Sequence, residues 1–510
     1  MNKTIDRCYI CNGKSRNLCP AAGKVICSVC CGSKRGTVIR CAPGCAYSPF
    51  SINGYDLWLK TDTNLVRKIL MYAIDARGRS HFEKITNDMF FKNANDSPEQ
   101  IEATAAGSAI YNILFLERDK HGKTLAQHWK SSGWNGLTND ERVMMTCRMD
   151  SRVTVFEIQK ILDNKAMECV DLFDIPKGVF ILIDRSIAAR VARFTRLFTW
   201  LTHYPNFSRP ENSGIEIPDF IFQEFMDMTQ KSFKKALKKS RGFTIKDYLS
   251  ENVGAFCELA FNLARDTNVG MLKRMDMHQC KAFYKIEGIF AEVKAIVDSY
   301  PDFQVRERNP EEKPLEGAFY YSWLRRGESK ALEEEMNAAF RHDDESHGVG
   351  TIGNLTLCPD KIIIEVFSKQ KFEFAKKMID NYFKEAVTLQ NEMVVDLAKQ
   401  MAEKIDDEGS LRDEVFSEDP NTRSGPIPAE IERKLAQDFY RNHYGKFIDD
   451  QIPALNNMTP RQAAKDPAMR PKLVDLMKQH LKGIEKQNKD KKMDLNIGWI
   501  LDELKLAELK

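Results

Sequence analysis

Hydrophobic positions after residue 50 recur at the period of an α-helix. Leu65, Ile69, Tyr72 and Ala73 fall on one face of such a helix. The helical spacing continues up to about residue 150, where a pattern typical of strands begins. We therefore expect residues 51–150 to form a helical region.

After residue 150, short runs rich in β-branched and aromatic residues alternate with turn residues. These runs are residues 153–162, 166–173, 179–183, 193–201 and 215–217. Short strands separated by regular turn signals are typical of small all-β modules. The pattern predicts a small antiparallel β-barrel over residues 151–218.

The second half of the chain alternates between helical and mixed patterns. Residues 219–279 return to helical spacing, and residues 280–400 have a mixed α/β pattern. In the mixed part, we expect a hairpin around Pro359 and a helix capped by Ser368. An acidic linker is expected over residues 401–428, followed by C-terminal helices over residues 429–510.

The composition is that of a globular protein, and the net charge of the chain does not indicate a nucleic-acid partner. The chain has 510 residues, of which 43% are hydrophobic and 29% charged, and this length suggests several domains. The formal net charge is +3. A value so near zero gives no general attraction to nucleic acid.

The sequence shows neither a secretory signal nor a membrane span. No apolar stretch of signal-peptide length follows Met1. The apolar run over residues 179–183 is far shorter than the ~20 residues that a span needs. We therefore expect a cytoplasmic protein without a membrane partner, in which clustered cysteines are metal ligands or reactive thiols rather than disulfides.

Eight of the 13 cysteines lie near the start of the chain. They are Cys8, Cys11, Cys19, Cys27, Cys30, Cys31, Cys41 and Cys45. The spacing includes two Cys-x2-Cys pairs and one Cys-x3-Cys pair, and such pairs let a tight turn direct two sulfurs to one ion. Because Zn²⁺ takes four ligands in a tetrahedron, the eight thiols predict one or two Zn²⁺ ions in a module over residues 1–50.

Two other interpretations of the cysteine block are buried core thiols and a redox role for one Cys-x2-Cys pair. The sequence leaves the ligand partition open, because adjacent Cys30 and Cys31 compete for the same turn. Eight basic residues and one acidic residue make the module strongly basic. Thiolates and metal together would remove most of that excess, which weakens the case for a nucleic-acid partner.

A basic stripe follows the predicted barrel. It consists of Lys231, Lys234, Lys235, Lys238, Lys239 and Arg241. On a helix, the lysines share one face that could contact phosphates of a nucleic acid or an acidic partner. The alternative is an ordinary solvated face of an amphipathic helix.

The predicted architecture is a multidomain α+β protein that is mainly helical. It has an N-terminal zinc finger, a small antiparallel β-barrel in the middle and C-terminal helices. The predicted order is a zinc-binding module (1–50), a helical region (51–150), a barrel (151–218), a helical region with the basic stripe (219–279), an α/β segment (280–400), an acidic linker (401–428) and a C-terminal helical module (429–510).

No familiar catalytic motif occurs in the sequence, and we assign no catalytic residue. The polar run over residues 341–347 contains two histidines and three acidic residues, but neighbouring side chains rarely converge on one ion. His278 and Cys280 lack a visible orienting group. The series Arg190, Arg193 and Arg196 fits an RNA-contacting strand, and it fits a barrel strand with alternating faces equally well.

Several stretches resemble a known group of proteins. Residues 19–23, 26–32, Arg35 and 39–47 resemble the opening of largely uncharacterised bacterial zinc-finger proteins with a treble-clef or MYND-like cysteine block. Residues 155–158, 170–173 and 350–368 resemble other parts of these proteins. Residues 452–464, with the run Thr-Pro-Arg-Gln-Ala-Ala, resemble a module found near the C-termini of SEC-C-motif proteins. The resemblance implies metal binding and no agreed reaction, and this chain adds Cys8 and Cys11 to the block.

The leading hypothesis from the sequence is a zinc-binding protein that recognises another macromolecule without catalysis. A protein partner is favoured, because the net charge is near zero and the loaded zinc module is only mildly basic. The second hypothesis is a regulatory protein that binds nucleic acid. The third is an enzyme whose active site is assembled from residues distant in sequence.

Overall fold

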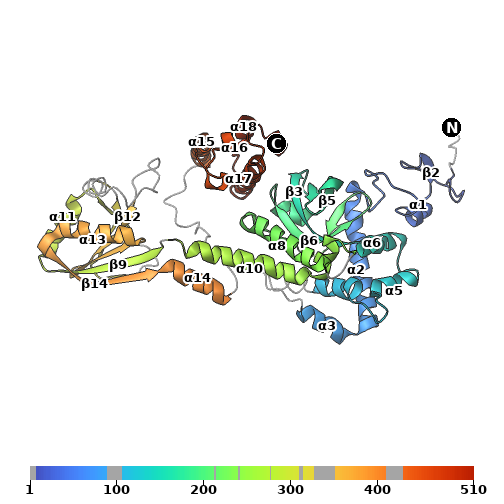
Figure 1. Cartoon of the computed structure of the whole chain (residues 1–510), viewed down its shortest axis with the longest axis horizontal. Helices are drawn as coiled ribbons and strands as arrows, with labels where there is room; N and C mark the ends of the chain where they lie inside the picture. The colour runs from blue at the N-terminus through green and yellow to red at the C-terminus, as the bar shows by residue number, and fades with distance from the viewer. Residues whose placement is uncertain are drawn as a thin grey trace. The chain divides into compact units, whose positions relative to one another are not determined.

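The chain forms two compact units, which are drawn in Figure 1. One unit combines Met1–Ala264 with Arg412–Lys510, and the other is Arg265–Leu411. The computed structural model describes residues 7–88, 106–211, 214–238, 242–275, 277–308, 314–324, 326, 351–408 and 429–510. The structure is mixed α/β and 51% helical.

The N-terminal module is a short hairpin followed by one helix. Strand β1 (Asn17–Cys19) pairs with β2 (Lys24–Ile26), and α1 (Ser28–Lys34) follows. In the described part of this module, the buried core cluster consists of five residues, namely Cys8, Cys19, Ile26, Cys30 and Ile39. A core this small, made largely of thiols, cannot by itself offset the entropy of ordering the segment.

A helical region follows the N-terminal module. It consists of α2 (Tyr55–Arg77), α3 (Arg79–Asp88), the π-helical turn Asn112–Leu116, α5 (Leu125–Ser131) and α6 (Asn139–Met149). Trp58, Leu65 and Ile69 of α2 are buried in its core. At the start of α2 only glycine fits, because a Cβ on Gly54 would lie 1.8 Å from the carbonyl oxygen of Ser48.

The predicted barrel is present and closed by five strands. They are β3 (Arg152–Ile161), β4 (Ala166–Asp171), β5 (Val179–Ile183), β6 (Arg196–His203) and β7 (Ser208–Pro210). The short strand β8 (Ile215–Glu216) pairs with Leu197 and Phe198 of β6. The order around the barrel is β3-β4-β5-β7-β6, closed by pairing of β3 with β6. The pairing is not wholly antiparallel as expected, because β5 and β7 run parallel.

The parallel pair arises from the chain path between β5 and β6. Helix α7 (Arg185–Arg190) crosses from one strand to the other, so β7 closes the barrel beside β5. A five-stranded barrel with this order, and with a helix between its third and fourth strands, has the topology of the OB-fold.

Helices cover the barrel and complete the first unit. Helices α8 (Asp219–Leu237), α9 (Ile245–Glu251) and α10 (Val253–Leu272) share a core with β3 and β6. The C-terminal module contains α15 (Ala429–Phe447), α16 (Pro460–Ala463), α17 (Arg470–Lys491) and α18 (Gly498–Glu503). Thr459 caps α16 in a capping box with Gln462, which is the structure that a threonine before proline favours.

The second unit is built on a six-stranded antiparallel sheet. Its order is β10 (Phe303–Val305), β11 (Phe319–Leu324), β12 (Thr351–Leu357), β13 (Lys361–Val366), β9 (His278–Ile286) and β14 (Val387–Asp396). Helices α11 (Phe290–Ser299) and α13 (Lys369–Phe383) contribute to its core. The expected hairpin around Pro359 and the Ser368 cap are both confirmed. Helix α14 (Leu397–Glu408) forms the start of the expected acidic linker, whose residues 409–428 lie outside the described part of the chain.

Candidate metal centre

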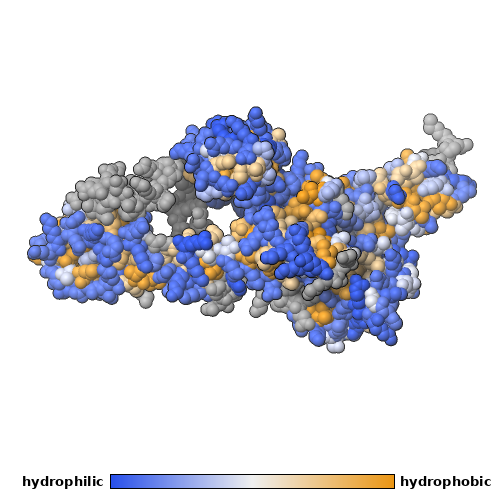
Figure 2. All heavy atoms as spheres, in the orientation of Figure 1, coloured by the Kyte–Doolittle hydropathy of each residue, from blue (hydrophilic) through white to orange (hydrophobic). Residues whose placement is uncertain are grey.

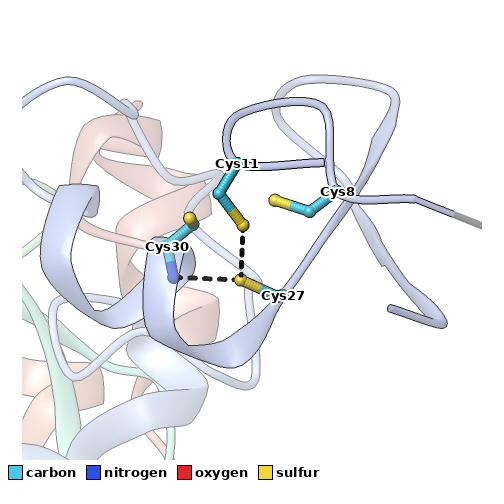
Figure 3. A group of neighbouring side chains, drawn as sticks. All are labelled: Cys8, Cys11, Cys27 and Cys30. Carbon is cyan, nitrogen blue, oxygen red and sulfur yellow. Dashed lines mark hydrogen bonds between the residues drawn. The ribbon is translucent and has the colours of Figure 1, made fainter. Parts of the chain in front are cut away.

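Four of the predicted ligands converge in the N-terminal module. The sulfur atoms of Cys8, Cys11, Cys27 and Cys30 all lie within 4.8 Å of one another (Figure 3). A tetrahedral zinc site with Zn–S bonds of about 2.3 Å places its sulfurs about 3.8 Å apart. The Sγ atoms of Cys11 and Cys27 are 3.6 Å apart. The four thiols could therefore hold a metal ion with little rearrangement, and we call them the first quartet.

Two tight turns position the first quartet. In the turn after Cys8, the amide of Asn12 donates to the Cys8 carbonyl at 2.8 Å, and Asn12 itself has a φ of +60°. Cys27 is the N-cap of α1, and its sulfur accepts a hydrogen bond from the amide of Cys30 at 3.4 Å. Each Cys-x2-Cys pair thus brings two sulfurs to the same side of one turn, as the spacing predicts.

The first quartet has an uneven distribution of acidity. Burial alone would raise the pKa of Cys8, but hydrogen bonds from the backbone of Cys11, Cys27 and Ile10 lower that pKa to about 6. Hydrogen bonds to Cys11 and Cys27, together with burial, raise the pKa of Cys30 to about 12. Binding of a dication would displace the protons of these thiols.

The other four predicted cysteine ligands are not in the first quartet. Cys19, Cys31, Cys41 and Cys45 line a separate cavity of about 240 Å³. Within the described ranges, the first quartet is the one group of three or more such ligands with all its donor atoms within 4.8 Å. Sequence reasoning left the adjacent pair Cys30 and Cys31 unassigned. The structure separates them, because neighbouring residues on a helix point about 100° apart.

The basic stripe lies on the exposed face of α8. Lys231, Lys234, Lys235 and Lys238 are exposed, whereas the buried face of this helix is formed by Ile221, Phe225 and Thr229. Lys239 and Arg241 lie outside the described residues. Four of the six predicted contact residues are therefore exposed to solvent, and the described residues show no binding site among them.

Two of the three arginines in the series, Arg193 and Arg196, form ion pairs within the first unit. The Arg196 side chain is 3% exposed and its Nε donates to Glu157 at 2.8 Å. Arg193 pairs with Glu485 of α17. The expected strand with alternating faces is wrong for this series: Arg190 ends α7, Arg193 precedes β6, and residues 196–202 of β6 are all buried.

The two weak catalytic candidates gain no support. Residues 341–347 lie outside the described part of the chain. The imidazole of His278 lies 3.5 Å from Asp396, while Cys280 is buried in the core of the second unit. These contacts place His278 beside an acidic side chain and Cys280 in ordinary packing.

Comparisons with known proteins found no match. No protein-family model, curated protein or solved structure matches the chain. Among the described helices, none combines the length and the apolar character needed to cross a membrane.

Proposed function

We propose that this chain is a zinc-binding multidomain protein that recognises a protein partner and catalyses no reaction. The observation that carries the metal part is the convergence of four cysteine sulfurs in the first quartet. Four thiolates favour zinc among common divalent ions, and they leave no open coordination position for a substrate. The resemblance of the cysteine block to bacterial zinc-finger proteins supports the same proposal.

The N-terminal module also offers apolar surface. Leu18, Val29, Val38 and Tyr47 are between 61% and 76% exposed, and Figure 2 shows hydrophobic atoms at the surface of this module. Metal binding would hold these side chains on a rigid support. Exposed apolar side chains gathered on a small rigid module favour a protein partner over solvent alone.

The barrel argues against nucleic acid as the main partner. In OB-fold barrels, the usual oligonucleotide face consists of the second and third strands, the loop between the first and second strands and the loop between the fourth and fifth strands. Here Ala166 of β4 and Ile183 of β5 are buried with Tyr204 and Phe207 of that loop in the core of the helical region. Asn206 also donates to the carbonyl of Phe50 at 2.9 Å. Part of the usual face is therefore covered by the protein itself.

The cysteines support a proposal on the compartment. All 13 cysteines are free thiols in this structure. A thiol-rich chain with metal-binding spacing fits a reducing compartment, and we propose the cytoplasm.

A capture experiment tests the choice of partner. The full chain, immobilised after zinc loading, is expected to retain its partner from a lysate after nuclease treatment. Val29→Asp or Val38→Asp should weaken that retention, because a charge is placed on the apolar surface. Val305→Asp, at an equally exposed position on β10, is the matched control and should change nothing. Loss of the partner on nuclease treatment would instead favour nucleic acid.

Neutralising the basic stripe tests the second candidate function. Replacing Lys231, Lys234, Lys235 and Lys238 with glutamine should change the free energy of unfolding by no more than about 0.5 kcal/mol per site, because these side chains are exposed. Under our proposal, partner retention stays the same. A nucleic-acid binder would lose affinity and show a salt dependence shallower by about 0.9 in log–log slope for each lost phosphate contact.

A further inference from the structure

Cys19, Cys31, Cys41 and Cys45 come from four separate positions in the N-terminal module. Cys19 ends β1, Cys31 lies on α1, and the other two lie in the loop that leads to α2. All four line the cavity of about 240 Å³. We propose that they form a second metal site, which takes a divalent cation of zinc-like chemistry, and we call them the second quartet.

Helix α1 explains how one short segment serves two sites. Cys30 is directed toward Cys11 and Cys27 of the first quartet (Figure 3). Cys31, the next residue along the same turn, lines the cavity instead. Since consecutive helical residues point about 100° apart, the adjacent cysteines supply one ligand to each ion. The two quartets share no residue and use all eight cysteines of the module.

The loop that carries Cys41 and Cys45 is anchored at its C-terminal end. The carbonyl of Cys45 accepts a hydrogen bond from the Ser51 hydroxyl at 2.5 Å. Arg35 donates to the carbonyl of Tyr47 and, through Nε, to Asp140 of α6 at 2.8 Å. Arg35 also lines the cavity beside Cys31 and Cys41. Four thiolates around a dication carry a net charge of about −2, which a neighbouring guanidinium partly offsets.

The second quartet is more open than the first. Its sulfurs do not meet the 4.8 Å spacing of the first quartet, and the cavity between them is lined by Leu18, Ile26 and Ile39 as well. Binding of the second ion would draw the Cys41–Cys45 loop onto α1 and β1. We therefore expect the second ion to bind after the first and to leave first on titration with a chelator.

Stoichiometry of variants separates the two sites. By elemental analysis, the purified full chain should hold about two zinc ions. Cys41→Ser/Cys45→Ser should retain one, and so should Cys8→Ser/Cys11→Ser. Cys147→Ser, outside the module, is the control and should retain both. Cobalt substitution adds a second readout, because each double variant should lose about half of the thiolate-to-cobalt absorption.

A labelling experiment on the unaltered chain does not depend on the folding of variants. In the zinc-loaded protein, the second-quartet cysteines should resist iodoacetamide, and a chelator should expose them to alkylation before those of the first quartet. One zinc per chain, with Cys41 and Cys45 alkylated while Cys8 and Cys11 stay protected, would overturn the second site and leave the first intact. Absence of zinc from both quartets would overturn the proposed metal-binding function itself.

Discussion

Replacing Cys27 with serine is expected to abolish zinc binding at the first quartet and to destabilise the N-terminal module. Cys27 is one of the four converging thiols, its sulfur contacts that of Cys11, and it caps α1. Structural zinc sites of this type contribute about 10–16 kcal/mol of apparent binding free energy to folding. The five buried residues of the module cannot replace a contribution of that size. The helices after residue 55 have their own core and should stay folded.

Zinc content and limited proteolysis measure this result. The Cys27→Ser chain should hold at least one zinc ion fewer than the unaltered chain, and proteases should cleave it within the first 50 residues. Cys257→Ser, a substitution outside the module on α10, serves as the control and should keep both its zinc and its resistance. Full zinc content and an intact N-terminus in the Cys27→Ser chain would contradict our assignment of Cys27 as a ligand.

The cysteine spacing predicted a metal site, but it could not show which cysteines bind the same ion. A Cys-x2-Cys pair determines the local geometry of two sulfurs, because both lie on one turn. Which pairs meet depends on the β1–β2 hairpin and on the direction of α1, and these are tertiary features. The adjacent pair Cys30 and Cys31 contained a usable signal, since helical geometry requires them to point in different directions.

The strands of the barrel could likewise be predicted only in part from the sequence. Residues 153–162, 166–173 and 179–183 were predictable strands, because their apolar and β-branched runs are long enough to be recognised. Strand β7 has three residues and ends at Pro210, so no hydrophobic pattern marks it. Strand β7 forms because the neighbouring strands β5 and β6 have backbone N–H and C=O groups that need hydrogen-bond partners. Its absence from the prediction also concealed the parallel β5–β7 pair.

A buried ion-pair network beside the barrel was not predictable from sequence. Arg148 of α6 is 6% exposed. Its Nε donates to Glu211 at 2.6 Å, and its Nη2 donates to Asp62 of α2 at 2.7 Å. The Tyr204 hydroxyl donates to the other oxygen of Glu211 at 2.8 Å. Three distant segments thus satisfy one guanidinium and one carboxylate, and no local pattern marks any of them.

Replacing Arg148 with methionine should therefore destabilise the first unit by about 3–5 kcal/mol. The loss arises because the Glu211 carboxylate, with its side chain 5% exposed, stays buried without its cation. Arg185→Met is the matched control: the Arg185–Asp56 pair is 48% and 79% exposed, and such exposed pairs contribute at most about 1 kcal/mol. Urea unfolding of the zinc-saturated chain, followed by tryptophan fluorescence, measures both changes.

A second substitution identifies the cause of the Arg148 effect. Removing the charge of Glu211 in the same chain, as Arg148→Met/Glu211→Gln, should restore part of the lost stability, because a neutral amide costs less to bury than a carboxylate. If the double variant were as unstable as the sum of the two single variants, the loss would come from packing of the arginine side chain, and the buried carboxylate would not be its cause. Recovery by about 1 kcal/mol or more would show that the network stabilises the unit mainly by neutralising Glu211.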